Sequence, residues 1–215
     1  LRRLVGVSLE HPVVASFLVA LVVRLAFVLV SSFAVEGVLI PDEEQYLNLA
    51  LVASEGELDE TFWPGYGQSM FDSARTFMWP LTALFWIFGP SRLVGQLMAA
   101  LFGAAAASLT ASLASRFWRP HIALGAGLLV AVFPSQILWS SVVIREAPVW
   151  VGLAAIAIVV DWSRRGNSTS RILASALSLG LLYVSVVWLR EQTAVLALWC
   201  LIPACLFGCK KMSVR

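Results

Sequence analysis

Long apolar segments recur along the whole of this chain. Six of them, each of 16 to 22 residues, alternate with short stretches that carry most of the charges: 13–34, 93–114, 122–143, 147–162, 172–189 and 193–208. A helix rises about 1.5 Å per residue and the bilayer core is about 30 Å thick, so the longer segments can cross it. Hydrophobic residues make up 60% of the chain, far more than in soluble domains. We therefore expect an all-α, multi-pass transmembrane bundle of about six spans, with residues 1–215 as a single domain.

The basic residues predict the orientation of these spans. With six spans, ten of the fifteen basic side chains fall at one end of the bundle and four at the other. Because Lys and Arg are enriched in cytoplasmic loops, we place the ten, and the N-terminus, in the cytoplasm. We expect an integral protein of the plasma (inner) membrane whose opposite end is extracytoplasmic. That end is acidic, which excludes nucleic acid as a partner.

Residues 35–91 form a long external loop in this topology. Nine of the thirteen acids lie within residues 36–72. Apolar residues recur at helical spacing in the first part of the loop, namely Tyr46, Leu49, Ala50 and Ala53. This pattern predicts an amphipathic helix lying on the membrane surface. Residues 79–88 are apolar but too few to span the bilayer, and they predict a second interfacial or re-entrant helix.

Three carboxylates at the external ends of spans are candidates for catalysis. Asp42 and Glu43 follow the first span, and Glu146 lies in the short connection between the third and fourth. A carboxylate near the membrane surface can act as a general base for an acceptor hydroxyl, and arginines can hold a phosphate through charge-assisted hydrogen bonds. The external arginines assigned to phosphate binding are Arg75, Arg145 and Arg190.

Each of these residues has a purely structural alternative. Asp42 and Gln45 have the spacing of a capping box, in which Asp42 would begin a helix. Arg145 and Glu146 could form an ion pair in a solvated turn. No group of residues has the spacing of a zinc site, and no cofactor is required by the pattern. A divalent cation held by Asp42, Glu43 and Glu146 is an open alternative.

Aromatic residues of the external loop are candidates for substrate contact. Tyr46, Trp63 and Tyr66 could stack on sugar rings, although Trp and Tyr are also common in the interfacial belts of membrane proteins. Arg24 lies inside the first span, where an unpaired charge costs about 3 kcal/mol or more, so it needs a partner. Glu146 or Glu191 would be that partner only if its helix dipped or a cavity brought its carboxylate down to the depth of Arg24.

The order of several motifs along the chain resembles a known family. These motifs are Arg24 in the first span, Pro41-Asp42-Glu43-x-x-Tyr46, Arg75-x4-Pro80-Leu81, Phe88-Gly89, Arg92, Pro134, Ser140, Glu146-x-Pro148 and Leu189-Arg190-x-x-Thr193. Together they resemble the N-terminal portion of GT-C superfamily integral membrane glycosyltransferases, in particular the protein-mannosyltransferase and aminoarabinose-transferase-like branch. The resemblance covers nearly all of the chain but only about half of a typical member, so we expect further chain in the complete protein.

The resemblance implies transfer of a sugar from a polyprenyl-phosphate donor to an acceptor on the extracytoplasmic face. Asp42 would be the base that activates the acceptor, with Glu43 beside it and Glu146 as a second acid. Arg75 and Arg190 would contact the donor phosphate. The implied partners are the polyprenyl-phosphate sugar, membrane lipids and an acceptor of unknown identity. Two alternatives remain open: an inactive GT-C-like subunit that binds lipid or a partner, and a transporter or flippase.

Overall fold

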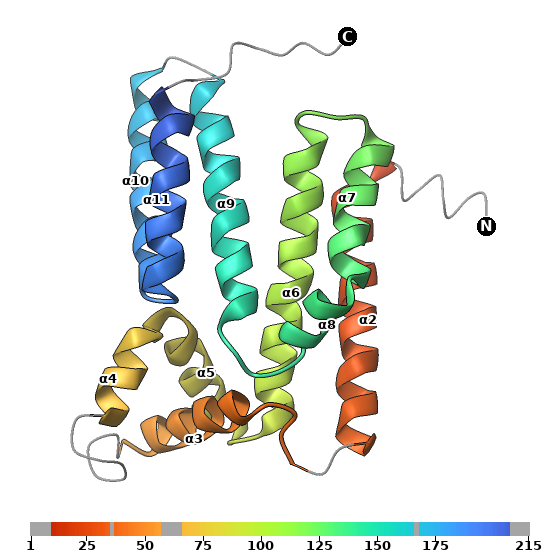
Figure 1. The fold of residues 1–215 in the computed structure, drawn as a ribbon, viewed down its shortest axis with the longest axis vertical. Coiled ribbons are helices and arrows are strands. Elements are labelled where there is room, and N and C mark those ends of the chain that lie inside the picture. Colours follow the sequence, from red (N-terminus) through yellow and green to blue (C-terminus); the bar gives the residue numbers. More distant parts are fainter. Residues whose placement is uncertain (1–9, 35–36, 57–65, 166–167, 207–215) are drawn as a thin grey trace.

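The structure, a computed structural model, describes residues 10–34, 37–56, 66–165 and 168–206, and for residues 66–67 and 201–206 it describes only the backbone. These residues form helices and no strand (Figure 1). In chain order the helices are α2 (Pro12–Ala34), α3 (Pro41–Glu55), α4 (Tyr66–Ser73), α5 (Arg75–Phe88), α6 (Arg92–Ser115), α7 (Pro120–Val132), α8 (Pro134–Trp139), α9 (Glu146–Arg164), α10 (Thr169–Val187) and α11 (Glu191–Leu206). The all-α prediction is therefore confirmed for the described residues.

Four helices are long and apolar enough to cross a membrane, namely α2, α6, α9 and α10. They run side by side, and α7 and α11 lie alongside them (Figure 1). Those two have 13 and 16 residues, which is short for a bilayer about 30 Å thick. The multi-pass prediction holds with four candidate spans, and six spans remain a prediction.

The third predicted span, residues 122–143, is not one continuous helix. Phe133 is extended, with φ −64° and ψ 123°, and it separates α7 from α8. Proline has no N–H group and disfavours helical geometry at the residue before it, so Pro134 ends α7 and begins α8. After Trp139 the chain leaves the helix, and residues 140–144 are buried. The helix is thus interrupted at Pro134, and residues 122–143 stay a predicted span.

Helix α6 is the centre of the bundle and packs against α2, α7 and α9. The small residues spaced four apart along it are all buried: Gly95, Ala99, Gly103, Ala107 and Ala111. A Cβ atom at Gly103 would collide with the side chains of Arg24 and Ser140, so only glycine fits there. This row of small residues allows neighbouring helices to approach closely.

Arg24 lies fully buried in α2 and is held by uncharged acceptors. Its Nε donates to the Ser140 hydroxyl at 2.6 Å. Its terminal nitrogens donate to the carbonyl oxygens of Ala20 at 3.1 Å, Ala131 at 3.2 Å and Val130 at 3.4 Å. These contacts connect α2 to the end of α7 and to Ser140, the residue after α8.

The helix break supplies two of these acceptors. In a continuous helix the carbonyl of Val130 would accept from the N–H of residue 134, but Pro134 has none. The same break displaces the N–H that would otherwise serve Ala131, so both carbonyls are available to the guanidinium. Arg24 therefore pairs with neither Glu146 nor Glu191, and its contacts give it a structural role between helices.

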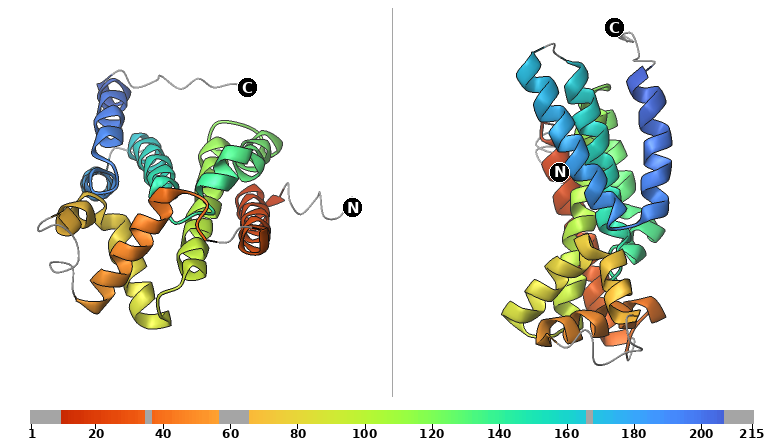
Figure 2. Two further views of the ribbon diagram at one scale, coloured as in Figure 1. Left: turned by 60° about the horizontal axis from the view of Figure 1, so that its bottom comes forward. Right: turned by 90° about the vertical axis from the view of Figure 1, so that its left-hand side faces the viewer.

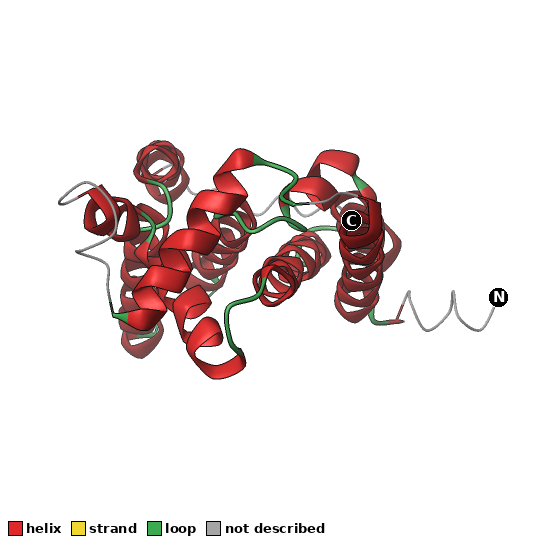
Figure 3. Cartoon of the chain, turned by 90° about the horizontal axis from the view of Figure 1, so that it is seen from below, coloured by secondary structure: helices red, strands yellow, loops and turns green. Residues whose placement is uncertain are grey.

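Helices α3, α4 and α5 form a layer at one end of the bundle (Figure 2). Seen from that end, helices of the layer cross over the long helices, which are viewed nearly along their axes (Figure 3). An apolar core joins the layer to the bundle, and its members include Tyr46, Phe71, Phe77, Met78, Leu81, Val142 and Val143. Residues 35–91 thus contain three helices in their described parts, α3, α4 and α5.

The apolar face predicted for α3 is confirmed. Tyr46, Leu49 and Ala50 are buried, and Ala53 packs against the same core. This face contacts α5, so it is buried within the protein. Gly56 ends the helix with φ 81°, a left-handed conformation that glycine adopts without strain. That the layer lies on a membrane surface remains a prediction.

Candidate functional site

The carboxylate of Glu43 is the junction between the layer and the bundle. It is fully buried. Arg92 donates to its two oxygens, each at 3.2 Å, and the Gln96 amide donates at 3.1 Å. The backbone N–H groups of Leu39 and Val143 donate at 3.3 Å each. One side chain therefore connects the first turn of α3, the first turns of α6 and the segment before α9.

The local sequence explains this junction. Arg92 and Gln96 are one helical turn apart, so their side chains lie on the same face of α6. Sequence reasoning placed Glu43 beside Asp42 but missed both of its partners. The signal that could have identified them is an Arg-x-x-x-Gln pair opening an otherwise apolar span, since a buried polar pair requires a complementary group.

Asp42 does not cap α3. Ile40 is the residue before the helix, with φ −137° and ψ 134°, and it makes no side-chain capping bond. Pro41 occupies the first helical position, which its fixed φ favours, and Asp42 follows within the first turn. The capping-box interpretation is therefore wrong. Asp42 is exposed and forms no ion pair with any residue that the structure describes.

Tyr46, one turn further along α3, is surrounded by charged groups. Its side chain is 7% exposed, and this burial raises the pKa of the phenol above 10.0. Arg145 and Arg190 lower that pKa, whereas Glu146 and Asp42 raise it. Tyr46 packs in one apolar core with Ile144 and Leu189, the residues that precede Arg145 and Arg190, so these arginines and the first turn of α3 lie at the same end of the bundle.

Glu146 and Arg190 form an ion pair across two helix ends. The Arg190 terminal nitrogen lies 3.1 Å from the Glu146 carboxylate, and both side chains are partly exposed. Glu146 is the first residue of α9, and Arg190 follows α10. Arg145 makes one long contact, 3.5 Å to the backbone carbonyl of Ser73. It forms no ion pair with the described residues, and Glu146 pairs with Arg190 in place of the alternative pair with Arg145.

Arg75 forms an ion pair with Asp72. Its Nε donates to the Asp72 carboxylate at 2.9 Å, and Gln68 donates to the same oxygen at 3.0 Å. The hydrogen bond from Arg75 holds the pKa of Asp72 below 3.8, so this acid is ionised at neutral pH. The guanidinium also lies over the Trp188 ring, 5.6 Å from its centroid. Sequence reasoning missed Asp72, although a spacing of three residues from Arg75 is a signal for a pair.

The remaining candidates are described only in part. Trp63 lies outside the described residues, and so does the side chain of Tyr66, whose backbone begins α4. In the part of the chain that the structure describes, no three His, Cys, Asp or Glu side chains are grouped so that they could hold a metal ion. Both oxygens of Glu43 already accept hydrogen bonds, which makes this residue a poor cation ligand.

Comparisons with protein-family models, with curated proteins and with solved structures find no match to this chain.

Proposed function

We propose that this chain is a membrane glycosyltransferase of the GT-C type, or the N-terminal module of one, that uses a polyprenyl-phosphate sugar. The observation that carries the proposal is the exposed, unpaired carboxylate of Asp42 beside Tyr46, at the end of the bundle that also holds Arg145 and Arg190. A base and a phosphate-binding group at one membrane-proximal end are what sugar transfer from a lipid phosphate requires.

The transfer step follows from these groups. The Asp42 carboxylate accepts the proton of the acceptor hydroxyl as its oxygen forms a bond to the anomeric carbon of the sugar. The bond between that carbon and the phosphate oxygen breaks, and the polyprenyl phosphate leaves with the electron pair. Arg145 and the outer nitrogens of Arg190 stabilise the negative charge that develops on the phosphate.

The neighbouring residues have supporting roles in this proposal. Glu43 is buried and saturated with donors, so it fixes the first turn of α3 and thereby the position of Asp42. Glu146 orients Arg190 through their ion pair. Arg75 is balanced by Asp72 and is less suited to a phosphate than the sequence predicts. Trp63 and Tyr66 stay predictions as substrate contacts.

The distribution of charge supports an orientation for the proposal. At the end opposite Asp42, Arg116 and Arg165 both pair with Asp161 at 2.8 Å, so the two basic loops meet there. Because basic loops favour the cytoplasm, we assign this end to the cytoplasm of a plasma membrane and the Asp42 end to the extracytoplasmic side.

Two variants in the same helical turn test the proposal. We expect Asp42→Asn to reduce transfer from a radiolabelled polyprenyl-phosphate sugar at least about 100-fold, the lower range for a general base, with membrane insertion intact. Glu44→Gln, which changes another exposed acid of the first turn, should retain activity. Both variants are measured in the full chain in proteoliposomes. Undiminished transfer by Asp42→Asn would refute the catalytic assignment.

The same assay separates the alternative functions. The Glu146–Arg190 pair, in which each side chain neutralises the other, favours a non-catalytic lipid-binding subunit as the second candidate. Binding of the lipid-linked sugar by the wild type without any turnover would identify such a subunit. A flippase would move the labelled lipid between leaflets without transfer. The contacts of Arg24 with carbonyls and a hydroxyl give that third function no support.

A further inference from the structure

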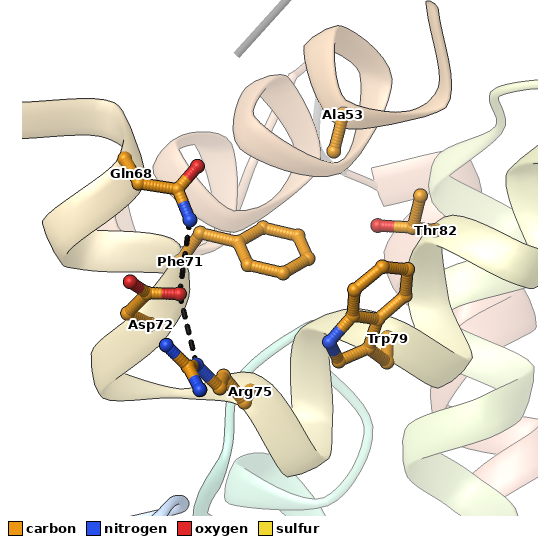
Figure 4. Close-up of a pocket in the computed structure, with 7 residues that line it drawn as sticks. All are labelled: Ala53, Gln68, Phe71, Asp72, Arg75, Trp79 and Thr82. Carbon is orange, nitrogen blue, oxygen red and sulfur yellow. Dashed lines mark hydrogen bonds and ion pairs between the residues drawn. The ribbon is translucent and has the colours of Figure 1, made fainter. Parts of the chain in front are cut away.

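A cavity of about 340 Å³ lies between α3, α4 and α5, within the layer at the end of the bundle. It is lined by Ala53, Gln68, Phe71, Asp72, Arg75, Trp79 and Thr82 (Figure 4). Asp42, Glu43 and Glu146 do not line it. The cavity is thus separate from the carboxylates of the proposed transfer site.

The hydroxyl of Thr82 lines this cavity and has no hydrogen-bond partner among the described residues. The residue is 8% exposed, and its Oγ1 makes no hydrogen bond with the described residues. Figure 4 shows the hydroxyl pointing across the cavity towards Phe71. Hydroxyls inside helices ordinarily donate to a carbonyl one turn back, as Thr110 does to Ala106 at 2.8 Å. The exception at Thr82 leaves a buried donor and acceptor available to a ligand.

The charges of Asp72 and Arg75, which line the cavity, neutralise each other. Asp72 accepts from both Arg75 and Gln68, forming a hydrogen-bonded row along one wall (Figure 4). The pKa of Asp72 is lowered by Arg75, so one positive and one negative group face the cavity at neutral pH. A phosphate would gain the guanidinium but would be repelled by the adjacent carboxylate. The wall is suited to a neutral ligand with several hydroxyl groups.

Two aromatic rings form the other wall. Phe71 is buried, and Trp79 packs edge-on against it with 5.5 Å between ring centroids. The Trp79 side chain is 63% exposed although it lines the cavity, so much of its ring surface is uncovered. An indole face can stack on an apolar ring surface while hydroxyls at the ring edge bond to polar neighbours.

We propose that this cavity binds a neutral pyranose ring, stacked on Trp79 and hydrogen-bonded to Thr82 and to the Gln68–Asp72–Arg75 row. An apolar ligand would leave the Thr82 hydroxyl without a partner, and an anion would be repelled by Asp72. A pyranose has hydroxyls for the polar wall and C–H faces for the aromatic one. The proposal concerns binding alone and does not rest on the transfer reaction at Asp42.

The sugar could be free or could be the headgroup of a glycolipid, and the experiment separates these sources. The full chain is reconstituted in lipid nanodiscs, and binding is measured by saturation-transfer NMR with the methyl glycosides of glucose, mannose and galactose. A second arm uses nanodiscs that contain a monoglucosyl diacylglycerol. If the natural ligand is a headgroup, the glycolipid competes with the soluble glycoside; if it is a free sugar, the glycolipid has no effect.

Variants identify the cavity as the binding site. We expect Thr82→Val, which keeps the shape of the side chain, to weaken binding about fivefold or more, because a polar ligand loses its partner. Trp79→Ala should weaken it about tenfold through loss of stacking. Trp86→Ala is the matched control, since Trp86 lies on the same helix, is 78% exposed and does not line the cavity. Asp42→Asn should bind the glycoside like the wild type.

Several outcomes would overturn the proposal. One is that none of the glycosides binds in either arm. Another is that excess inorganic phosphate displaces a bound glycoside, which would make the cavity an anion site. The proposal also fails if Thr82→Val and Trp79→Ala both bind like the wild type, or if Asp42→Asn abolishes binding. Loss of transfer activity in Asp42→Asn with glycoside binding intact leaves both proposals standing.

Discussion

Glu43→Gln is expected to destabilise the protein although it replaces a single atom. The carboxylate accepts five hydrogen bonds, two of them from Arg92. A glutamine has one acceptor oxygen, and its amide nitrogen would face groups that are themselves donors. The change therefore leaves part of the guanidinium, and at least one buried N–H group, without an acceptor.

The magnitude follows from the burial of the two partners. Breaking a buried ion pair by removing one member costs about 3–5 kcal/mol. Glu43 is fully buried, but the Arg92 side chain is 22% exposed, so water compensates part of the loss. We take the lower end, about 3 kcal/mol. On the scaling for chains of 150–250 residues, of about 2–4 °C per kcal/mol, the thermal midpoint should fall by about 6–12 °C.

The assay is thermal unfolding of the purified chain in nanodiscs, in which size-exclusion chromatography after heating measures the fraction that remains folded. Glu44→Gln is the matched control, because it makes the same chemical change one residue away on an exposed side chain, and its effect should stay within about 0.5 kcal/mol. The double variant Glu43→Gln/Arg92→Gln should cost less than the sum of the single changes. Equal midpoints for Glu43→Gln and Glu44→Gln would refute the role of Glu43 as a junction.

Three further outcomes are expected. Gly103→Ala should cost about 1–3 kcal/mol in thermal unfolding through collision with Arg24, whereas Gly180→Ala, where nothing lies within 4 Å of the added atom, should be neutral or stabilising. The lowered pKa of Asp72 means that its ion pair contributes fully above pH 3.8 and is lost as pH falls through the lowered value. The difference in thermal midpoint between wild type and Asp72→Asn should therefore be constant above pH 3.8, shrink as pH falls towards the lowered pKa, and vanish below that lowered pKa. In the proposed transferase, Arg145→Gln should raise KM for the lipid-linked sugar about tenfold or more, the effect of losing a charged hydrogen bond; an unchanged KM would remove Arg145 from the phosphate site.

The helices of this protein are readable from sequence where one physical signal dominates. Apolar length predicts α2, α6 and α10 because little else competes within those segments. Spacing also predicts the buried face of α3. In residues 122–143 two signals conflict: the apolar run favours a continuous helix, whereas Pro134 has no N–H group to complete the hydrogen bond that such a helix needs. The effect of proline on the backbone is the stronger of the two, and the helix is broken before Pro134.

The candidate site is predictable in its location but not in its pairings. Charged residues next to apolar segments must come out at the ends of helices, so Asp42, Glu146 and Arg190 meet at one end. Pairs within one helix follow from spacing, as for Asp72 and Arg75, but which acid meets which arginine across helix ends depends on how the helices are arranged around one another. Glu146 pairs with Arg190 at 3.1 Å even though Arg145 precedes it directly.

The contacts of Arg24 have a consequence for how the protein enters the membrane. Its acceptors on Val130, Ala131 and Ser140 lie between 106 and 116 residues further along the chain, and they exist only once α7 and α8 have been made. Until then α2 carries a cation in its middle that costs about 2.5–3.5 kcal/mol to insert. Helix α2 is thus expected to reach its final packing only after α7 and α8 have joined it, although it precedes both in the chain.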